Sequence, residues 1–170
     1  MKRLLIPISR LDRFIVRKVT DSVSSRTVAT ASTVGWLCDA RVLLTIGTVW
    51  WAVERGRGQS RRLAVRFTTT ILTTTALHHA IKRMIAQPRP DRGARNPSAL
   101  RTGRPFDAMP SGHAMHAGAI ASLISTELPP SKGVWMAAAL MAATRIVTLA
   151  HWPSGVLVGF TLGAVAAMCT

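Results

Sequence analysis

The stretch that decides the fold is PSGHAMHAGAIASLIS, residues 110–125. From Gly112 onward it is small and apolar, and it carries no Lys, Arg, Asp or Glu for fourteen residues. A run of this kind predicts a membrane-spanning helix. We place this helix at residues 112–128, because Pro129 and Pro130 cannot continue it.

Four further apolar segments flank this central one. They lie at about residues 34–53, 63–84, 134–149 and 156–168. The first contains Asp39 and Arg41, so only its later part is cleanly apolar. Several segments are near the short limit for crossing about 30 Å of hydrocarbon. The sequence therefore predicts an all-α, polytopic membrane helix bundle with about five transmembrane helices.

The charge of the chain fits this arrangement better than it fits a nucleic-acid binder. The 170 residues carry a formal net charge of +15, yet 48% of them are hydrophobic. A soluble basic protein would suggest nucleic acid. Here the basic residues lie in clusters between apolar segments, which is typical of multi-pass membrane proteins. We therefore expect no nucleic-acid partner.

The N-terminal part of the chain has a different pattern. Apolar residues recur at helical spacing over residues 4–19, and basic residues fall mostly on the other faces. This predicts an amphipathic helix that lies on an anionic membrane surface, with a cap packed on the domain as the alternative. Residues 20–32 are rich in Ser and Thr and are expected to be a connector. Residues 1–30 then form an interfacial segment, and residues 31–170 form the membrane domain.

Three separated motifs meet at one membrane face if the five segments alternate in direction. Lys82 lies at the end of the second segment and Arg89 in the loop beyond it, Ser111-Gly112-His113 open the third, and Arg145 and His151 end the fourth. Three cations suit a phosphate dianion. The helix N-terminus at Ser111 and Gly112 also favours an anion. Two histidines can supply a nucleophile and a general acid, so the group is equipped for phosphoryl transfer.

These motifs resemble the three-part signature of the type 2 phosphatidic acid phosphatase superfamily. The matching residues are Lys82-x6-Arg89-Pro90, Pro110-Ser111-Gly112-His113 and Arg145-x5-His151. The resemblance implies a lipid phosphate phosphatase that uses no metal and no other cofactor. It makes His151 the nucleophile, which becomes a phosphohistidine, and His113 the acid that protonates the leaving oxygen. Phosphate binding falls to Lys82, Arg89, Ser111, Gly112 and Arg145.

One departure from the family bears on catalysis. The family has an Asp four residues after the nucleophilic His, where it orients the imidazole, but this chain has Gly155. Loss of an orienting carboxylate can lower the rate of a His-based site by orders of magnitude. Asp39, Asp107 or a backbone carbonyl are the alternatives for that role. His79 and His116 are candidates for supporting hydrogen-bond donors at the pocket.

The basic residues also predict the side of the membrane. Seven Lys and Arg precede the first segment, and seven more lie between Lys82 and Arg104. The opposite side has five at the connection of the first two segments, counting Arg66 at the start of the second, and one at Lys132. The positive-inside rule places the N-terminus and the site in the cytoplasm, within the cell membrane.

The substrate class and the alternatives remain open at this stage. A polyprenyl-linked phosphate is favoured slightly over a phosphatidate-type or lipid A-type phosphate. A lipid phosphotransferase is one alternative function, and a catalytically weak lipid-phosphate-binding protein is another, because of Gly155. Gly155, Gly159 and Gly163 form a stripe that permits close helix packing, either inside the chain, which we favour, or in a homodimer.

Overall fold

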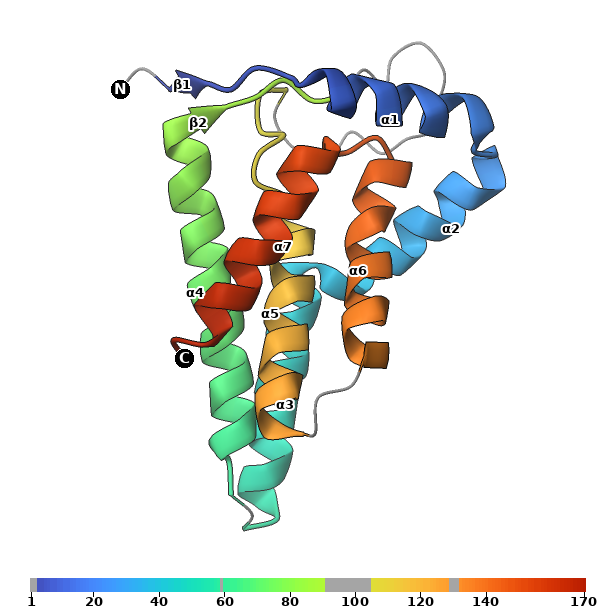
Figure 1. Cartoon of the computed structure of the whole chain (residues 1–170). Helices are drawn as coiled ribbons and strands as arrows, with labels where there is room; N and C mark the ends of the chain where they lie inside the picture. Colours follow the sequence, from blue (N-terminus) through green and yellow to red (C-terminus); the bar gives the residue numbers. More distant parts are fainter. Residues whose placement is uncertain (1–2, 59, 91–104, 129–131) are drawn as a thin grey trace.

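Helix α5 (Gly112–Glu127) forms the axis of a helical bundle in a computed structural model that describes residues 3–58, 60–90, 105–128 and 132–170. Around it lie α4 (Arg62–Met84), α6 (Lys132–Val147) and α7 (Pro153–Ala167), and α3 (Ala40–Gly56) runs beside α4 (Figure 1). Nearly every residue of α5 from Gly112 to Leu123 is buried. The predicted helix at residues 112–128 is confirmed, as is the all-α fold.

Small residues bring α5 and α7 into close contact. An added Cβ at Gly159 would lie 2.5 Å from the Ser111 carbonyl oxygen, and one at Gly163 would lie 1.8 Å from that of Met115. On α5, a Cβ at Gly118 would lie 2.1 Å from the Phe160 carbonyl oxygen. The glycine stripe therefore packs inside the chain, as the sequence favoured. A homodimer would need another surface.

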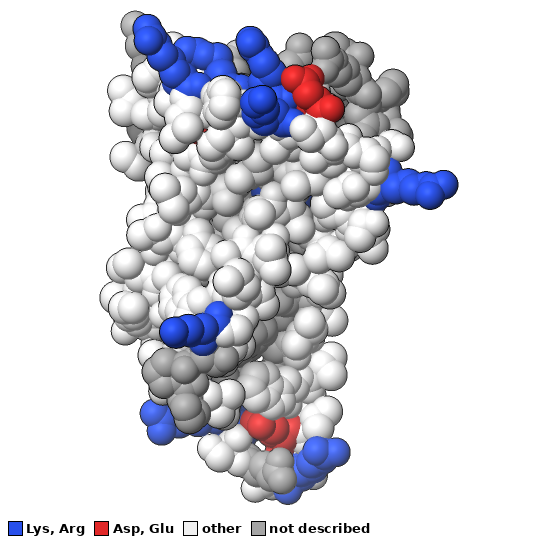
Figure 2. Space-filling model, turned by 45° about the vertical axis from the view of Figure 1, so that its right-hand side comes forward, with Lys and Arg blue, Asp and Glu red and all other residues white. Residues whose placement is uncertain are grey.

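The bundle keeps small residues inside and large apolar residues outside. Its main buried cluster contains Ala114, Ala117, Ala121, Ala138 and Ala142. Large apolar side chains on the outer faces of α4, α6 and α7 are exposed, among them Leu72, Leu140 and Leu157. Figure 2 shows basic side chains gathered mainly towards the two ends of one face, with mostly uncharged residues between them. Helices in lipid pack in this way, through small residues, and present apolar side chains outward.

The length and apolar character of each helix can be compared with what a membrane span requires. Within the described ranges, no single helix is both long and apolar enough to cross a membrane. One pair passes that test together: residues 25–38 and α3, bent by 44° at Asp39. Four of the predicted segments are helices at the expected places, but the first is broken at Asp39, so that its helix α3 begins only at Ala40. The number of membrane spans stays a prediction.

The N-terminal region differs from its sequence-based description. Helix α1 (Arg10–Ser22) begins after a capping box, in which the Ser9 hydroxyl accepts from the Asp12 amide and the Asp12 carboxylate accepts from the Ser9 amide. Residues before it form β1 (Leu4–Leu5), which pairs in parallel with β2 (Ile85–Ala86). The predicted helix over 4–19 therefore starts too early. Helix α1 contacts α6 and α7, so one side of it caps the bundle.

The predicted connector is also wrong, because most of it is helical. Helix α2 (Ser25–Gly35) packs against α6 and continues into a 3₁₀ turn, η1 (Trp36–Cys38). Ser24 caps it by accepting from the Thr27 amide. The hydroxyls of Thr30 and Thr33 donate to carbonyls one turn back, which satisfies these side chains within the helix. The expected domain boundary at residues 30–31 falls inside α2.

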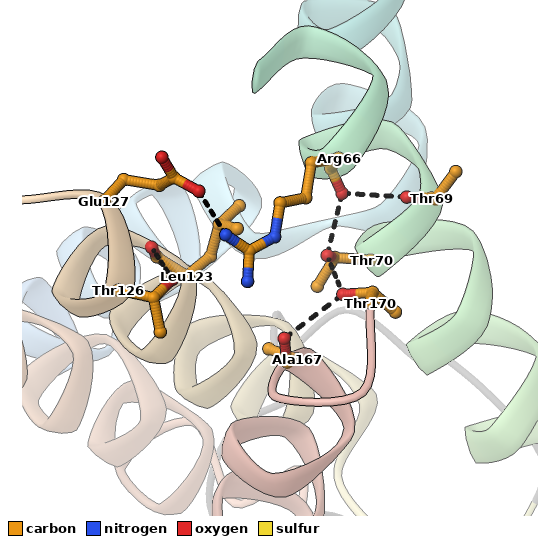
Figure 3. A network of polar contacts seen from close by, with 8 residues as sticks. All are labelled: Arg66, Thr69, Thr70, Leu123, Thr126, Glu127, Ala167 and Thr170. Atoms are coloured by element: carbon orange, nitrogen blue, oxygen red, sulfur yellow. Dashed lines mark hydrogen bonds and ion pairs between the residues drawn. The ribbon is translucent and has the colours of Figure 1, made fainter. Parts of the chain in front are cut away.

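A polar network joins three helices at the far end of the bundle (Figure 3). The Arg66 guanidinium of α4 pairs with the Glu127 carboxylate of α5. The Thr70 hydroxyl lies 2.6 Å from that of Thr170, which follows α7. The Thr70 hydroxyl also donates to the Arg66 carbonyl at 2.8 Å. These contacts fasten the ends of α4, α5 and α7 to one another, away from the motifs.

Candidate active site

The turn between α6 and α7 presents His151. Helix α6 ends in a loop where the amides of Ala150 and His151 both donate to the Arg145 carbonyl, at 3.0 and 3.2 Å. Leu149 adopts a left-handed conformation, with φ at 52°. A non-glycine residue in this conformation is strained, and such strain persists where surrounding structure holds it. The turn thus places Arg145 and His151 together.

The His151 ring is fixed by a backbone carbonyl. Its Nδ1 lies 2.7 Å from the Ala108 carbonyl oxygen. Because a carbonyl can only accept, Nδ1 carries the proton and Nε2 keeps its lone pair. A Cβ at Gly155 would lie 2.6 Å from the same oxygen. The sequence left Asp39, Asp107 and a backbone carbonyl as candidates for orienting the ring, and the backbone carbonyl of Ala108 makes this contact. The missing side chain at Gly155 leaves space for that carbonyl.

Burial keeps His151 neutral. The side chain is 3% exposed. Burial lowers the pKa of His151 well below its usual value, and the charges of Arg89, Lys82 and Arg145 lower it further, against the opposing effect of the Ala108 bond. An uncharged imidazole with a free Nε2 is the form that can attack phosphorus.

Arg89 is held by the loops around this ring. Its guanidinium donates to the carbonyls of Ala150, at 2.9 Å, and Asp107, at 3.3 Å. Next to it, the indole of Trp152 donates to the Pro88 carbonyl at 2.6 Å. These bonds join the first and third motifs, which are far apart in the sequence.

The second motif supplies a helix N-terminus. Ser111 is fully buried and caps α5, and its amide donates to the Gly155 carbonyl at 3.0 Å. A Cβ at Gly112 would lie 2.9 Å from Nε2 of His78. His78 therefore covers the start of α5 from α4. Its neighbour His79, the residue expected at the pocket from the sequence, is instead exposed, and its ring contacts the His78 ring at a tilt of 56°.

Arg145 and Lys82, together with Arg89, form the basic group of the site. Arg145 is 8% exposed, and Gly35 leaves room for it, since a Cβ there would lie 3.2 Å from Nη1. Thr144 donates its hydroxyl to the Met141 carbonyl, so this hydroxyl is bonded within α6. Lys82, at the end of α4, interacts electrostatically with both Arg89 and Arg145.

His113 lies beside Asp39, at the start of α5. Its Nε2 is 4.0 Å from the Asp39 carboxylate, at the break between η1 and α3. Asp39 also caps α3 by accepting from the Arg41 amide at 2.9 Å. His113 interacts electrostatically with Arg145, Asp39 and Lys82. Asp39 therefore faces the second-motif histidine and does not orient His151.

The two remaining candidates have structural contacts. His116 Nδ1 donates to the Cys38 carbonyl at 3.0 Å, and its Nε2 lies 3.0 Å from the Thr75 hydroxyl. His116 thus ties η1 and α4 to α5. Asp107 pairs with Arg3 at 2.9 Å, so its carboxylate is not the group on His151. Among the described residues, no three His, Cys, Asp or Glu side chains converge as metal ligands would.

The sequence could not have identified two of these groups. The Ala108 carbonyl has no signature in the sequence, because every residue carries a backbone carbonyl. His78 and His79 differ only in their position around α4, which motif spacing does not resolve. The arrangement as a whole can bind an anion among Lys82, Arg89 and Arg145, and both His151 and His113 lie within electrostatic range of Lys82 and Arg145.

Comparison with known proteins identifies the family of this chain. A family model, the PAP2 superfamily, matches residues 63–170, and the chain belongs to that superfamily. Lipid A 1-phosphatases of Rhizobium etli and Rhizobium johnstonii are each 29% identical over 100 residues. That match covers 56% of this chain and only 43% and 41% of the relatives.

Two solved structures share the fold. LpxE of Aquifex aeolicus has a TM-score of 0.77 at 20% identity, over 98% of both chains. A transmembrane PAP2 type phosphatidylglycerolphosphate phosphatase of Bacillus subtilis has a TM-score of 0.66 at 22% identity, over 94% of this chain and 82% of that one. The family predicted from the three motifs is confirmed.

Proposed function

We propose that this protein is a membrane lipid phosphate phosphatase that works through a phosphohistidine on His151. The observation that carries the proposal is the geometry of that ring. Its Nδ1 is bound to the Ala108 carbonyl, which leaves Nε2 as the free nitrogen. Three cationic side chains lie within electrostatic range of it.

The reaction would proceed in two steps. In the first, Nε2 of His151 attacks the phosphorus of the lipid phosphate, the bond to the lipid oxygen breaks, and His113 donates a proton to that oxygen. In the second, His113 accepts a proton from water, which attacks the phosphohistidine and releases inorganic phosphate. Lys82, Arg89 and Arg145, with the Ser111 hydroxyl and the Gly112 amide, would stabilise the charge on the equatorial oxygens.

The substrate proposal follows from the relatives. Both curated relatives act on lipid A at its 1-phosphate, as their names state. A lipid A-type sugar phosphate therefore joins the polyprenyl-linked and phosphatidate-type phosphates as a leading candidate. All three share a terminal phosphate on a lipid, which is the chemistry that the basic group would recognise.

The placement in the membrane is part of the proposal. Exposed apolar residues on the outer faces of α3, α4, α6 and α7 favour a multi-pass arrangement in the cell membrane. Helix α1, the start of the chain and the motif loops lie at one end of the bundle (Figure 1). With the basic residues counted above, the positive-inside rule favours the cytoplasm for that end.

The test is phosphate release by the full chain in detergent from the three lipid classes. We expect release by the natural protein and loss of at least about a thousandfold in His151→Ala. His79→Ala is the matched control, because His79 is exposed, and it should keep full activity. Acid-labile labelling of the natural protein by ³²P-lipid, absent in His151→Ala, would identify the intermediate.

Other outcomes would favour the alternative functions. Transfer of ³²P to a second lipid without free phosphate would indicate a phosphotransferase. Binding of every lipid phosphate without labelling or release would indicate a catalytically weak binding protein. Equal activity in His151→Ala and the natural protein would contradict the proposal.

A further inference from the structure

Helix α1 reaches the nucleophile turn through one buried carboxylate. Asp12 is 3% exposed, although the opposite side of α1 is open. Its Oδ1 accepts from the Ser154 amide at 2.8 Å, and its Oδ2 accepts from the Ser154 hydroxyl at 2.9 Å. Ser154 lies 142 positions along the chain from Asp12 and three residues after His151.

The need for this contact comes from the start of α7. Trp152 occupies the N-cap position and makes no side-chain capping bond. Pro153 follows and has no amide hydrogen, so the Ser154 amide is the first donor at this helix end. The Asp12 carboxylate caps that amide from another helix. Its negative charge also complements the positive end of the α7 dipole.

Asp12 is charged at neutral pH. Burial acts to raise its pKa, but the hydrogen bonds from Ser154 and Ser9 outweigh burial and hold the pKa below its usual value. The lowered pKa means that the carboxylate form persists at any pH above about 4. The contact is therefore present in the whole range where a phosphatase of this kind would work.

The turn that carries His151 is thereby fixed at both of its ends. On one side it is held by the Arg145 carbonyl, which accepts from the amides of Ala150 and His151. On the other side it is held by Asp12 through Ser154. Between them, the His151 ring makes its own bond to Ala108. A shift of Ser154 would move the ring relative to that carbonyl.

We propose that Asp12 is a positioning residue for the nucleophile, and that α1 is therefore part of the catalytic apparatus and not only a surface segment. Asp12 lies outside the residues that the family model matches, which begin at residue 63. The inference rests on the proposed role of His151. The proposal predicts that α1, a helix outside the three motifs, affects turnover.

The test compares kinetics with a probe that needs no turnover. Asp12→Asn and Ser154→Ala are assayed singly and together in the full chain, with Asp21→Asn as the control acid on the same helix. We expect Asp12→Asn to lower kcat about tenfold with KM within about twofold, because a small displacement of a reacting group lowers the rate steeply. Ser154→Ala should lower kcat less, and the double variant should be no worse than Asp12→Asn.

The second readout is carbethoxylation of His151 by diethylpyrocarbonate, followed by mass spectrometry well below the unfolding temperature. We expect His151 to react several times faster in Asp12→Asn than in the natural protein or in Asp21→Asn. A purely structural role would lower the amount of folded protein and leave kcat and His151 reactivity of the folded fraction unchanged. That result would overturn the inference.

The experiments distinguish failure of the positioning role alone from failure of the proposed nucleophile. If the natural protein releases phosphate and Asp12→Asn matches it in kcat and His151 reactivity, the positioning role is wrong and the phosphatase stands. If His151→Ala is as active as the natural protein, the proposed nucleophile is wrong. The positioning role then fails as well, even where Asp12→Asn makes His151 more reactive.

Discussion

The Ala108 carbonyl oxygen lies 2.7 Å from Nδ1 of His151 and would lie 2.6 Å from a Cβ at position 155. The Ala108 carbonyl oxygen thus occupies the space beside the His151 ring that a side chain at residue 155 would need. The family's orienting Asp and this carbonyl exclude each other. Gly155 is therefore matched to a different way of holding the imidazole, and it does not by itself indicate an inactive site.

This relationship predicts that restoring the family residue is harmful. Gly155→Asp and Gly155→Ala should each lower kcat by at least about tenfold, because a Cβ at 2.6 Å must displace the Ala108 backbone and with it the bond to His151. Gly56→Ala is the control, since no atom lies within 4 Å of a Cβ there. Phosphate release from the best lipid measures the effect. Faster release by Gly155→Asp would show that the carbonyl does not orient the ring.

A second prediction concerns the protonation of His151. Its lowered pKa means that the folded protein keeps the neutral Nδ1–H form as pH falls from 7.5 to 5.5, whereas an ordinary histidine gains a proton near 6.5. The unfolded chain does gain that proton, so burial of His151 should make the free energy of unfolding decrease below about pH 6.5. Ring ¹⁵N shifts, assigned by comparison with His151→Ala, test the first point. A titration midpoint near 6.5 would contradict it.

The bundle helices were predictable because their apolar runs are long and end at prolines, glycines or charged residues. Helix α2 was not, because serine and threonine are weak helix formers, and its stability depends on hydroxyl bonds within the helix and on packing against α6. The start of α1 was missed although Ser9 and Asp12 have capping-box spacing. Local signals such as this one are short and easily outweighed by a longer apolar periodicity.

The site was predictable to the extent that its chemistry needs particular residue types. Cations and histidines in three motifs were found from the sequence, because phosphate binding restricts the choice of side chain. The Ala108 carbonyl and the contact of Asp12 with Ser154 were not found. Both depend on segments that meet only in the folded chain, and the first involves a group that every residue has.

A third prediction addresses the general acid. Asp39→Asn removes the negative charge 4.0 Å from His113 but keeps a side-chain oxygen that can cap α3. We expect kcat to fall about tenfold, since loss of a nearby carboxylate disfavours the protonated imidazole, with little change in KM or unfolding temperature. A lipid analogue with a nitrophenyl leaving group, which needs no proton, should be hydrolysed nearly normally. Equal loss on both substrates would indicate that Asp39 acts in some other way.

The Arg66–Glu127 pair at the far end of the bundle should affect stability without affecting catalysis. The two side chains are 21% and 25% exposed, so solvent weakens their attraction. Arg66→Met and Glu127→Gln should each lower the free energy of unfolding by about 1 kcal/mol or less, and the double variant should lose less than the sum, because the pair is broken only once. Activity should be unchanged in all three, since the pair joins α4 and α5 away from the motif residues (Figure 3). Denaturation in mild detergent, together with phosphate release from the same samples, measures both quantities. A loss of kcat without a loss of stability would mean that the far end of α5 is coupled to Ser111 and His113 at its start. The two ends of the bundle would then not have separate structural and catalytic roles.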